Sequence, residues 1–287
     1  MKKNSSHAID IAMTAIAPAI WGSTYYVTTQ FLPQGYPMHV AMLRALPAGL
    51  LLLLLVRRLP HGIWWGRVFV LGALNFAFFW VMLFMAAYRL PGGVAATVGA
   101  VQPLIVIALS RMYLARPIRT LTVAAGIIGI AGVACLVMTP KAALDPVGVA
   151  AAFAGAVSMA FGTVLTRKWQ PPVSSLTFTA WQLAAGGLLL VPVAVFFEPA
   201  LPALSAENVL GLAYLGLIGA AFTYLLWFRG LARIEPSAAA SLGFLSPVTA
   251  TLLGWLALGQ NLAPAQIAGF IMVLSSVWLS QKSQAPR

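Results

Sequence analysis

The chain has 287 residues, of which 61% are hydrophobic and 8% charged, and its mean hydropathy is +0.92. These values exclude an ordinary soluble domain and indicate a protein that crosses the membrane several times. The net charge of +12 could suggest a nucleic-acid partner, but the basic residues are spread over short polar segments without forming a basic face, so none is expected.

Ten apolar segments, each about long enough to cross the hydrocarbon core as a helix, follow one another along the chain. The sequence therefore predicts an all-α polytopic membrane protein. The predicted spans are approximately 9–31, 38–56, 67–88, 92–113, 120–138, 147–168, 175–196, 208–229, 236–257 and 264–281. The first segment carries Asp10, Pro18 and Gln30 and lacks a clear cleavage site, so we expect a helix rather than a signal peptide.

The last five segments repeat the pattern of the first five. The third segment and the start of the fourth contain Leu71-Gly72, Ala77-Phe78, Phe84, Arg89, Ala95-Ala96, Gly99 and Pro103, and the same residues recur 144 positions later. Because five is an odd number, the second copy enters the membrane from the opposite side, which defines an inverted-topology repeat. We expect two five-helix units, residues 1–140 and 141–287, around a central cavity.

Lysine and arginine predict the orientation of the chain. Nearly all of these residues outside the spans fall on one side, including Arg57, Arg58 and Arg116, whereas Arg89 and Lys141 fall on the other. Both termini are therefore expected to be cytoplasmic.

The residue patterns of enzymes and metal sites are missing from the sequence. It has no HExxH or GxxxxGK[ST] motif and no close set of histidine, cysteine and carboxylate residues, so we expect no enzyme activity, metal or cofactor. Cys135 is the only cysteine and is expected to pack inertly. Gly126, Gly129 and Gly132 form a stripe of small residues that could pack within the chain or against a second subunit. A homodimer is thus open, although a monomer is sufficient.

Short motifs recur at matching places in the two halves. Trp21-Gly22-Ser23 is echoed by Phe161-Gly162-Thr163, and Leu43-Arg44-Ala45 by Trp181-Gln182-Leu183. In this order and spacing, the motifs resemble the EamA-type ten-helix permeases of the drug/metabolite transporter superfamily over essentially the whole chain. The resemblance implies export of amino acids or related metabolites across the bacterial inner membrane, and within the family the chain is most similar to aromatic amino-acid exporters.

Aromatic and polar residues near mid-span are candidates for contact with such a substrate. Flat apolar walls would stack on an aromatic side chain, while a few polar groups would bind its amino and carboxyl groups. The predicted substrate-binding residues are Trp21, Tyr25, Asn75, Phe79, Trp80, Gln102, Ser158, Thr163, Tyr224 and Ser246. Aromatic residues in membrane helices also pack in the core or face lipid, so only part of this set is expected to line the cavity.

A second group of candidates lets helices break or pack closely. Structural or gating roles are predicted for Gly22, Arg44, Gly99, Pro103, Gly162, Gln182, Gly243 and Pro247. Each proline frees the carbonyl group one turn earlier, at Gly99 or Gly243, which could contact substrate, act as a hinge or simply accompany a kink. Arg44 is either architectural, with a side chain that can reach the outer interface, or a contact for a substrate carboxylate.

The five acidic residues all lie at span ends or in loops, where we expect them to be hydrated. Coupling to protons or sodium through an intramembrane carboxylate is therefore not expected, and facilitated diffusion or exchange is the simplest mechanism. A lipid or polyprenyl-phosphate translocase remains the alternative function, but it should place several basic residues in the cavity, and only Arg44 qualifies. The expected partners are a small-molecule substrate and membrane lipids.

Overall fold

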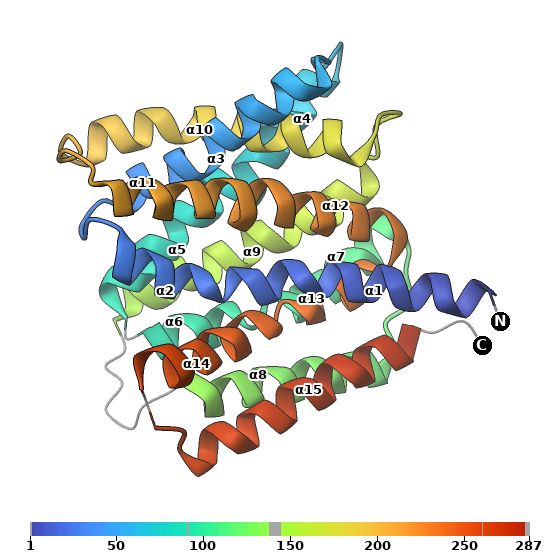
Figure 1. The fold of residues 1–287 in the computed structure, drawn as a ribbon. Coiled ribbons are helices and arrows are strands. Elements are labelled where there is room, and N and C mark those ends of the chain that lie inside the picture. The colour runs from blue at the N-terminus through green and yellow to red at the C-terminus, as the bar shows by residue number, and fades with distance from the viewer. Residues whose placement is uncertain (1, 91, 138–144, 260, 285–287) are drawn as a thin grey trace.

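The computed structural model describes residues 2–90, 92–137, 145–259 and 261–284, and these form a bundle of helices that run roughly parallel or antiparallel (Figure 1). The helices are α1 Lys2–Trp21, α2 Ser23–Phe31, α3 Pro37–Val56, α4 Trp64–Gly72, α5 Phe78–Arg89, α6 Gly92–Gly99, α7 Gln102–Leu114, α8 Thr120–Val137, α9 Pro146–Lys168, α10 Ser175–Phe197, α11 Ala206–Ala213, α12 Thr223–Arg233, α13 Pro236–Leu242, α14 Leu245–Leu258 and α15 Pro264–Gln284. Two π-helical segments, η1 Ala73–Ala77 and η2 Tyr214–Phe222, join α4 to α5 and α11 to α12.

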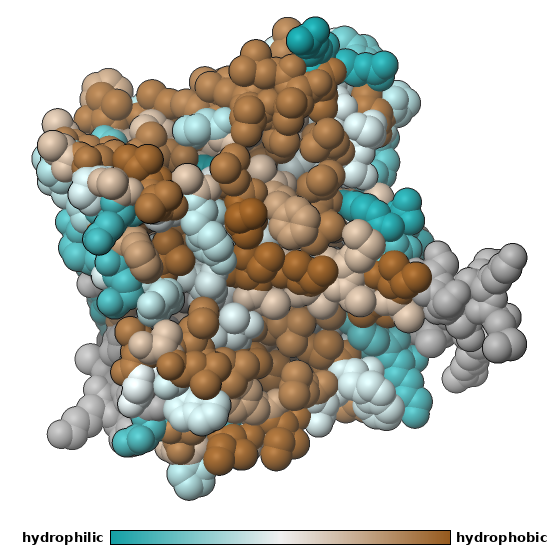
Figure 2. All heavy atoms as spheres, viewed as in Figure 1, coloured by the Kyte–Doolittle hydropathy of each residue, from teal (hydrophilic) through white to brown (hydrophobic). Residues whose placement is uncertain are grey.

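In the described residues these elements form ten spans, five of which are interrupted. Among the described residues, eight spans are long and apolar enough to cross a membrane on length and composition alone. The pair α1–α2 and helix α15 complete the ten, and the start of α1 lies on the same side of the bundle as the end of α15 (Figure 1). Hydrophobic residues cover most of the face seen in Figure 2, while hydrophilic residues gather toward the ends of the helices. The predicted all-α fold of two inverted five-helix repeats is confirmed.

The irregular segments occur at equivalent places in the two repeats. The π-helical segment η1 interrupts the third span, and η2 interrupts the eighth at the positions 144 residues later. The fourth and ninth spans break just before Pro103 and Pro247, where α6 gives way to α7 and α13 to α14. Proline lacks the backbone N–H that would continue a helix, and each of these two breaks lies beside a proline.

Glycines allow the spans to approach one another closely. A Cβ atom on Gly49 of α3 would lie 2.7 Å from the Ala184 Cα of α10, and one on Gly187 of α10 would lie 2.6 Å from the Leu46 Cα of α3. These two helices, one from each repeat, share the most extensive contact in the bundle. Backbones can come this close only where side chains are missing, which is the usual role of glycine in membrane helices.

The glycine stripe of α8 also packs within the chain. A Cβ atom on Gly126 would meet the Leu104 side chain of α7, one on Gly129 the Phe244 ring beside α14, and one on Gly132 the Val273 backbone of α15. The stripe thus contacts three different spans of the same molecule.

Candidate functional site

A cavity of about 350 Å³ lies between spans of both repeats. It reaches from the breaks in the fourth and ninth spans toward the ends of the helices near the 89–92 and 137–146 connections. The lining residues lie at the breaks or between them and this end of the bundle, which we call the open face, and none of them lies at the opposite end, where α1 begins, which we call the closed face. The cavity wall consists of Phe79, Leu83, Ala86, Ala95, Ala96, Gly99, Ala100, Gln102, Pro103, Val133, Val137, Ala152, Gly155, Ala156, Met159, Ala240, Gly243, Phe244, Ser246, Pro247 and Ala250.

The two helix breaks bring equivalent residues to the cavity. Gln102 and Ser246 occupy the same position in the inverted repeats and are the polar side chains of the described wall. A Cβ atom on Gly99 would meet no atom within 4 Å, so this glycine faces open space. The carbonyl group of Gly243 accepts a hydrogen bond of 3.1 Å from the backbone N–H of Ser246 and is therefore not left free by Pro247. Seven predicted residues line the cavity: Phe79, Gly99, Gln102, Pro103, Gly243, Ser246 and Pro247.

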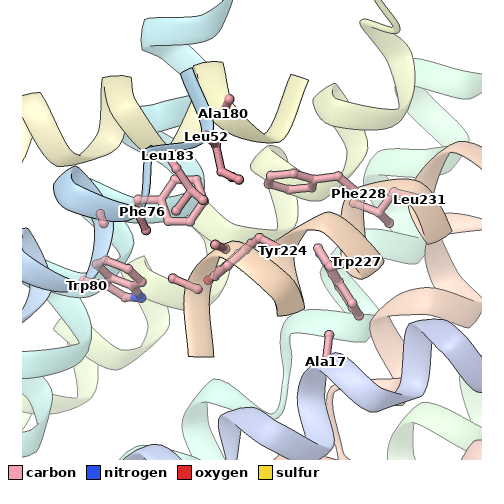
Figure 3. Packing of buried hydrophobic residues seen from close by; sticks show 14 of the residues in the cluster. Ala17, Leu52, Phe76, Trp80, Ala180, Leu183, Tyr224, Trp227, Phe228 and Leu231 are labelled. Carbon is pink, nitrogen blue, oxygen red and sulfur yellow. The ribbon is translucent and has the colours of Figure 1, made fainter. Parts of the chain in front are cut away.

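Three of the predicted aromatic residues, Trp21, Trp80 and Tyr224, belong instead to an aromatic core that also contains Phe76. Tyr224 lies with its ring centroid 4.9 Å from that of Trp21 and 4.5 Å from that of Phe76, and Phe76 is 5.4 Å from Trp80. Figure 3 shows Phe76, Trp80 and Tyr224 within this aromatic core, together with Phe228. Such ring pairs stabilise the junction between the repeats, and none of these rings is part of the cavity wall.

A buried polar cluster joins the third, sixth and seventh spans. The Asn75 side-chain amide donates hydrogen bonds to Gln182 Oε1 at 2.9 Å and to Thr166 Oγ1 at 3.1 Å. A Cβ atom on Gly162 would lie 2.7 Å from Asn75 Cγ, so the glycine makes room for this amide. The cluster lies outside the cavity wall, and Gln182 is fully buried.

Two more hydroxyl candidates lie nearby, away from the cavity wall. Ser158 Oγ donates a hydrogen bond of 2.9 Å to the carbonyl group of Leu74 in η1. Thr163 is fully buried next to Gly162. The predicted contact at Tyr25 lies outside the described residues, because its side chain is not placed.

Arg44 makes the equivalent contact in the other half of the molecule. Its Nη2 atom donates a hydrogen bond of 2.6 Å to the carbonyl group of Gly219 in η2, and its guanidinium lies 5.0 Å from the Trp80 ring centroid. Gly219 is the inverted counterpart of Asn75, as Gln182 is of Arg44. The second span of each repeat therefore contacts the π-helical segment of the other repeat, at the Gly219 carbonyl group in one case and at the Asn75 side chain in the other. Arg44 is buried rather than extended toward the interface, which supports its architectural role.

Ion pairs tie the repeats together at the closed face. Asp10 of α1 lies 2.8 Å from Arg229 and 3.4 Å from Arg233, both in α12. Arg116, before α8, lies 3.3 Å from Glu235, which precedes α13. All three contacts join residues of the first five spans to residues of the last five.

The open face has its own contacts between the repeats. Arg89 at the end of α5 lies 3.2 Å from Asp145, whose pKa is held below its usual value by the backbone N–H of Val147 and by Arg89. The carboxylate of Glu198, after α10, accepts a hydrogen bond of 2.9 Å from the backbone N–H of His39. The same carboxylate lies 2.8 Å from Nδ1 of the His39 ring. Arg89 thus pairs with Asp145 at the start of the sixth span, and its repeat counterpart Arg233 pairs with Asp10 in the first span.

Hydration of all five acidic residues, expected from their place at span ends, is wrong for two of them. The side chains of Asp10 and Glu198 are only 12% and 8% exposed. A carboxylate can leave water when charged partners or helix N–H groups replace it, and here arginines and the start of α3 do so.

Comparisons with known proteins agree with this architecture. Residues 9–138 and 146–281 each match the EamA-like transporter family. The chain is 47% identical over 267 residues to Protein PecM of Dickeya dadantii (strain 3937), covering 92% of this chain and 90% of PecM. It is 32% identical over 259 residues to the uncharacterized inner membrane transporter YedA of Escherichia coli (strain K12), covering 84% of each protein.

A crystal structure of a protein 21% identical to the chain has the same fold, with a TM-score of 0.81 over 96% of this chain and 98% of that one. The family matches cover nearly the whole length, and both named relatives align over most of theirs. The chain therefore belongs to the EamA-like transporter family and is a multi-pass membrane transporter.

Proposed function

We propose that this transporter exports small metabolites, most of all amino acids with aromatic side chains, across the bacterial inner membrane. Alternating access through the central cavity would carry the substrate. The observation that carries the proposal is the cavity itself, whose volume of about 350 Å³ is that of a small-molecule site and whose wall combines apolar side chains with two polar ones. The described wall comes from one copy of the chain, which supports a monomer as the transporting unit.

The chemistry of the wall suits a zwitterion with an aromatic side chain. Phe79, Met159 and Phe244 offer apolar and aromatic surface for a ring, while Gln102 and Ser246 offer hydrogen bonds. No charged side chain belongs to the described wall. A lipid or polyprenyl-phosphate headgroup would need cationic partners there, so the translocase alternative is less well supported.

Counterflow in proteoliposomes tests the substrate class. Vesicles loaded with excess unlabelled phenylalanine or tryptophan should take up the labelled form of the same amino acid transiently, whereas vesicles loaded with aspartate should not. Empty vesicles and vesicles containing denatured protein are the controls. Transfer of fluorescent lipid between leaflets without amino-acid counterflow would favour the translocase instead.

The orientation of the chain is part of the proposal and can be tested by labelling. In a Cys135→Ala background, we expect Glu207→Cys to react with a membrane-impermeant maleimide added to intact cells, and Leu59→Cys to react only after the membrane is opened. Both positions are exposed, so the difference would report the side of the membrane. The reverse pattern would place the basic residues outside and the cavity opening in the cytoplasm.

Transport is expected to proceed without tight coupling to protons or sodium. The described cavity wall has no carboxylate or histidine, and the paired Asp10 and Glu198 lie outside it. With equal substrate on both sides of the vesicle membrane, an imposed pH or sodium gradient should cause no lasting accumulation. Accumulation that collapses on addition of an ionophore would show that the cavity couples ions by other groups.

A further inference from the structure

One aromatic side chain of the cavity wall comes from the break in the ninth span. Phe244 precedes α14, is 3% exposed and packs with buried residues that include Val133, Val248 and Val273. Its inverted counterpart in the fourth span is Ala100, which also belongs to the wall. The two breaks therefore present a phenyl ring on one side of the cavity and a methyl group on the other. The width of the cavity depends on where the ring lies.

The ring is seated on Gly129 of α8. A Cβ atom on this glycine would lie 2.6 Å from both Cδ2 and Cζ of Phe244 and would overlap Cε2 between them. One edge of the ring thus occupies the space that any other residue would fill with its side chain. The ring cannot hold this position against α8 if residue 129 carries a side chain.

The ring lies between a buried cluster and the cavity. Leu136 and Val273 of that cluster are 2% and 0% exposed, whereas the ring itself belongs to the cavity wall. The cavity on the other side is open. A side chain at position 129 would therefore turn the ring toward the cavity and narrow it, because a phenyl group moves by rotation about two side-chain bonds.

We propose that Gly129 and Phe244 together set the largest substrate side chain that the cavity accepts, with Phe244 as the specificity-determining wall and Gly129 as its positioning residue. The inference rests on the proposed transport of amino acids through this cavity. It assigns a functional consequence to the middle glycine of the α8 stripe that its two neighbours in the stripe do not share. Gly126 contacts Leu104 and Gly132 contacts α15, and neither of these partners lines the cavity.

The test compares Gly129→Ala with Gly126→Ala in counterflow of alanine, leucine, phenylalanine and tryptophan. The control is closely matched, since Gly126 lies on the same helix as Gly129 and a Cβ atom on it would lie 2.5 Å from Leu104 Cδ2 of α7. We expect Gly129→Ala to lower kcat/KM for tryptophan about tenfold more than for alanine, as one methyl-sized change in an apolar pocket does. Gly126→Ala should keep the wild-type order of substrates. An equal loss for all substrates in both variants would overturn the inference.

A second substitution tests the contact itself. Phe244→Leu added to Gly129→Ala should restore tryptophan transport, because the shorter side chain relieves the overlap with the new methyl group. Alanine transport by each variant reports folding, because a fold defect would lower it together with tryptophan transport. Failure of the double variant to recover tryptophan transport relative to alanine transport would also overturn the inference.

A labelling readout keeps the inference testable if no amino acid is transported. In a Cys135→Ala background, Gly99→Cys places a thiol in the cavity. The rate at which this thiol reacts can then be measured with maleimides of increasing size. Adding Gly129→Ala should lower the reaction rate of the bulkiest maleimide about tenfold and leave the rate of the smallest maleimide unchanged. That result without amino-acid counterflow would reject the proposed function and retain the size control. Equal slowing of all reagents would reject the size control itself.

Discussion

Replacement of Gly99 by leucine is expected to abolish transport while the protein stays folded. Gly99 faces the cavity, and a Cβ atom there would meet nothing within 4 Å, so the larger side chain would fill space meant for substrate rather than collide with the bundle. A helical glycine also costs about 0.5–1 kcal/mol relative to a good helix former, so thermal stability in detergent should not fall. We expect kcat/KM in counterflow to drop by more than about tenfold.

Gly66→Leu is the matched control for this experiment. Gly66 also lies in a helix, α4, and also has no atom within 4 Å of its Cβ position, but it is exposed on the outer surface and does not line the cavity. The two variants add the same atoms and differ in where those atoms point. Transport by Gly99→Leu at the rate of Gly66→Leu would show that substrate takes a route other than this cavity.

Much of the fold could be predicted because the same residues recur in the two halves of the sequence at a fixed spacing of 144 positions. Pro103 and Pro247 lack a backbone N–H, which favours a break at equivalent points. Proline alone does not decide the matter, since Pro47 and Pro192 lie inside continuous helices, and it is the repeat that distinguishes the pair at 103 and 247. The same spacing relates η1 to η2, although no single residue type marks a π-helical segment in advance.

The cavity wall was harder to predict because its composition gives little signal. Apolar residues occur on every side of a membrane helix, so hydrophobic periodicity does not show which face of the third span holds Phe79 and which holds Trp80. Trp80 and Tyr224 pack in the aromatic core, a contact between residues far apart in sequence. Small residues such as Ala95 and Ala96 line the cavity, yet they resemble ordinary packing residues. The repeat was the useful signal, because it places Gln102 and Ser246 at equivalent positions beside the two helix breaks.

The two faces of the bundle carry related ion pairs that differ in burial. Arg233 and Arg229 pair with Asp10, whose side chain is 12% exposed, at the closed face. Arg89, the counterpart of Arg233, pairs with Asp145 at the open face, where the carboxylate is 31% exposed. Alternating access requires the closed face to open, and we expect α1 to separate from α12 in that step. The Asp10 pair is therefore expected to stabilise the conformation described here relative to the one that opens at the termini.

Asp10→Asn should shift this equilibrium toward opening at the closed face. An exposed ion pair is worth about 0–1 kcal/mol and loss of one partner of a buried pair costs about 3–5 kcal/mol. An intermediate change of about 1–2 kcal/mol corresponds to a shift of roughly 5- to 30-fold in population. The population that is open at the closed face can be measured with Ala240→Cys in a Cys135→Ala background. Residue 240 lines the cavity from α13 and is 1% exposed in the conformation described here.

We expect Asp10→Asn to raise the rate at which that cysteine reacts with an impermeant maleimide supplied from the side of the termini, in inverted vesicles. Asp145→Asn is the matched control, because it removes the corresponding carboxylate at the face that is already open, and it should leave this rate unchanged. Asp10→Glu keeps the charge and should behave like the unsubstituted protein. If Asp10→Asn and Asp145→Asn gave the same rate, the pair with Arg229 and Arg233 would support the packing of α1 without controlling access, and the barrier at the closed face would have to lie in the aromatic core.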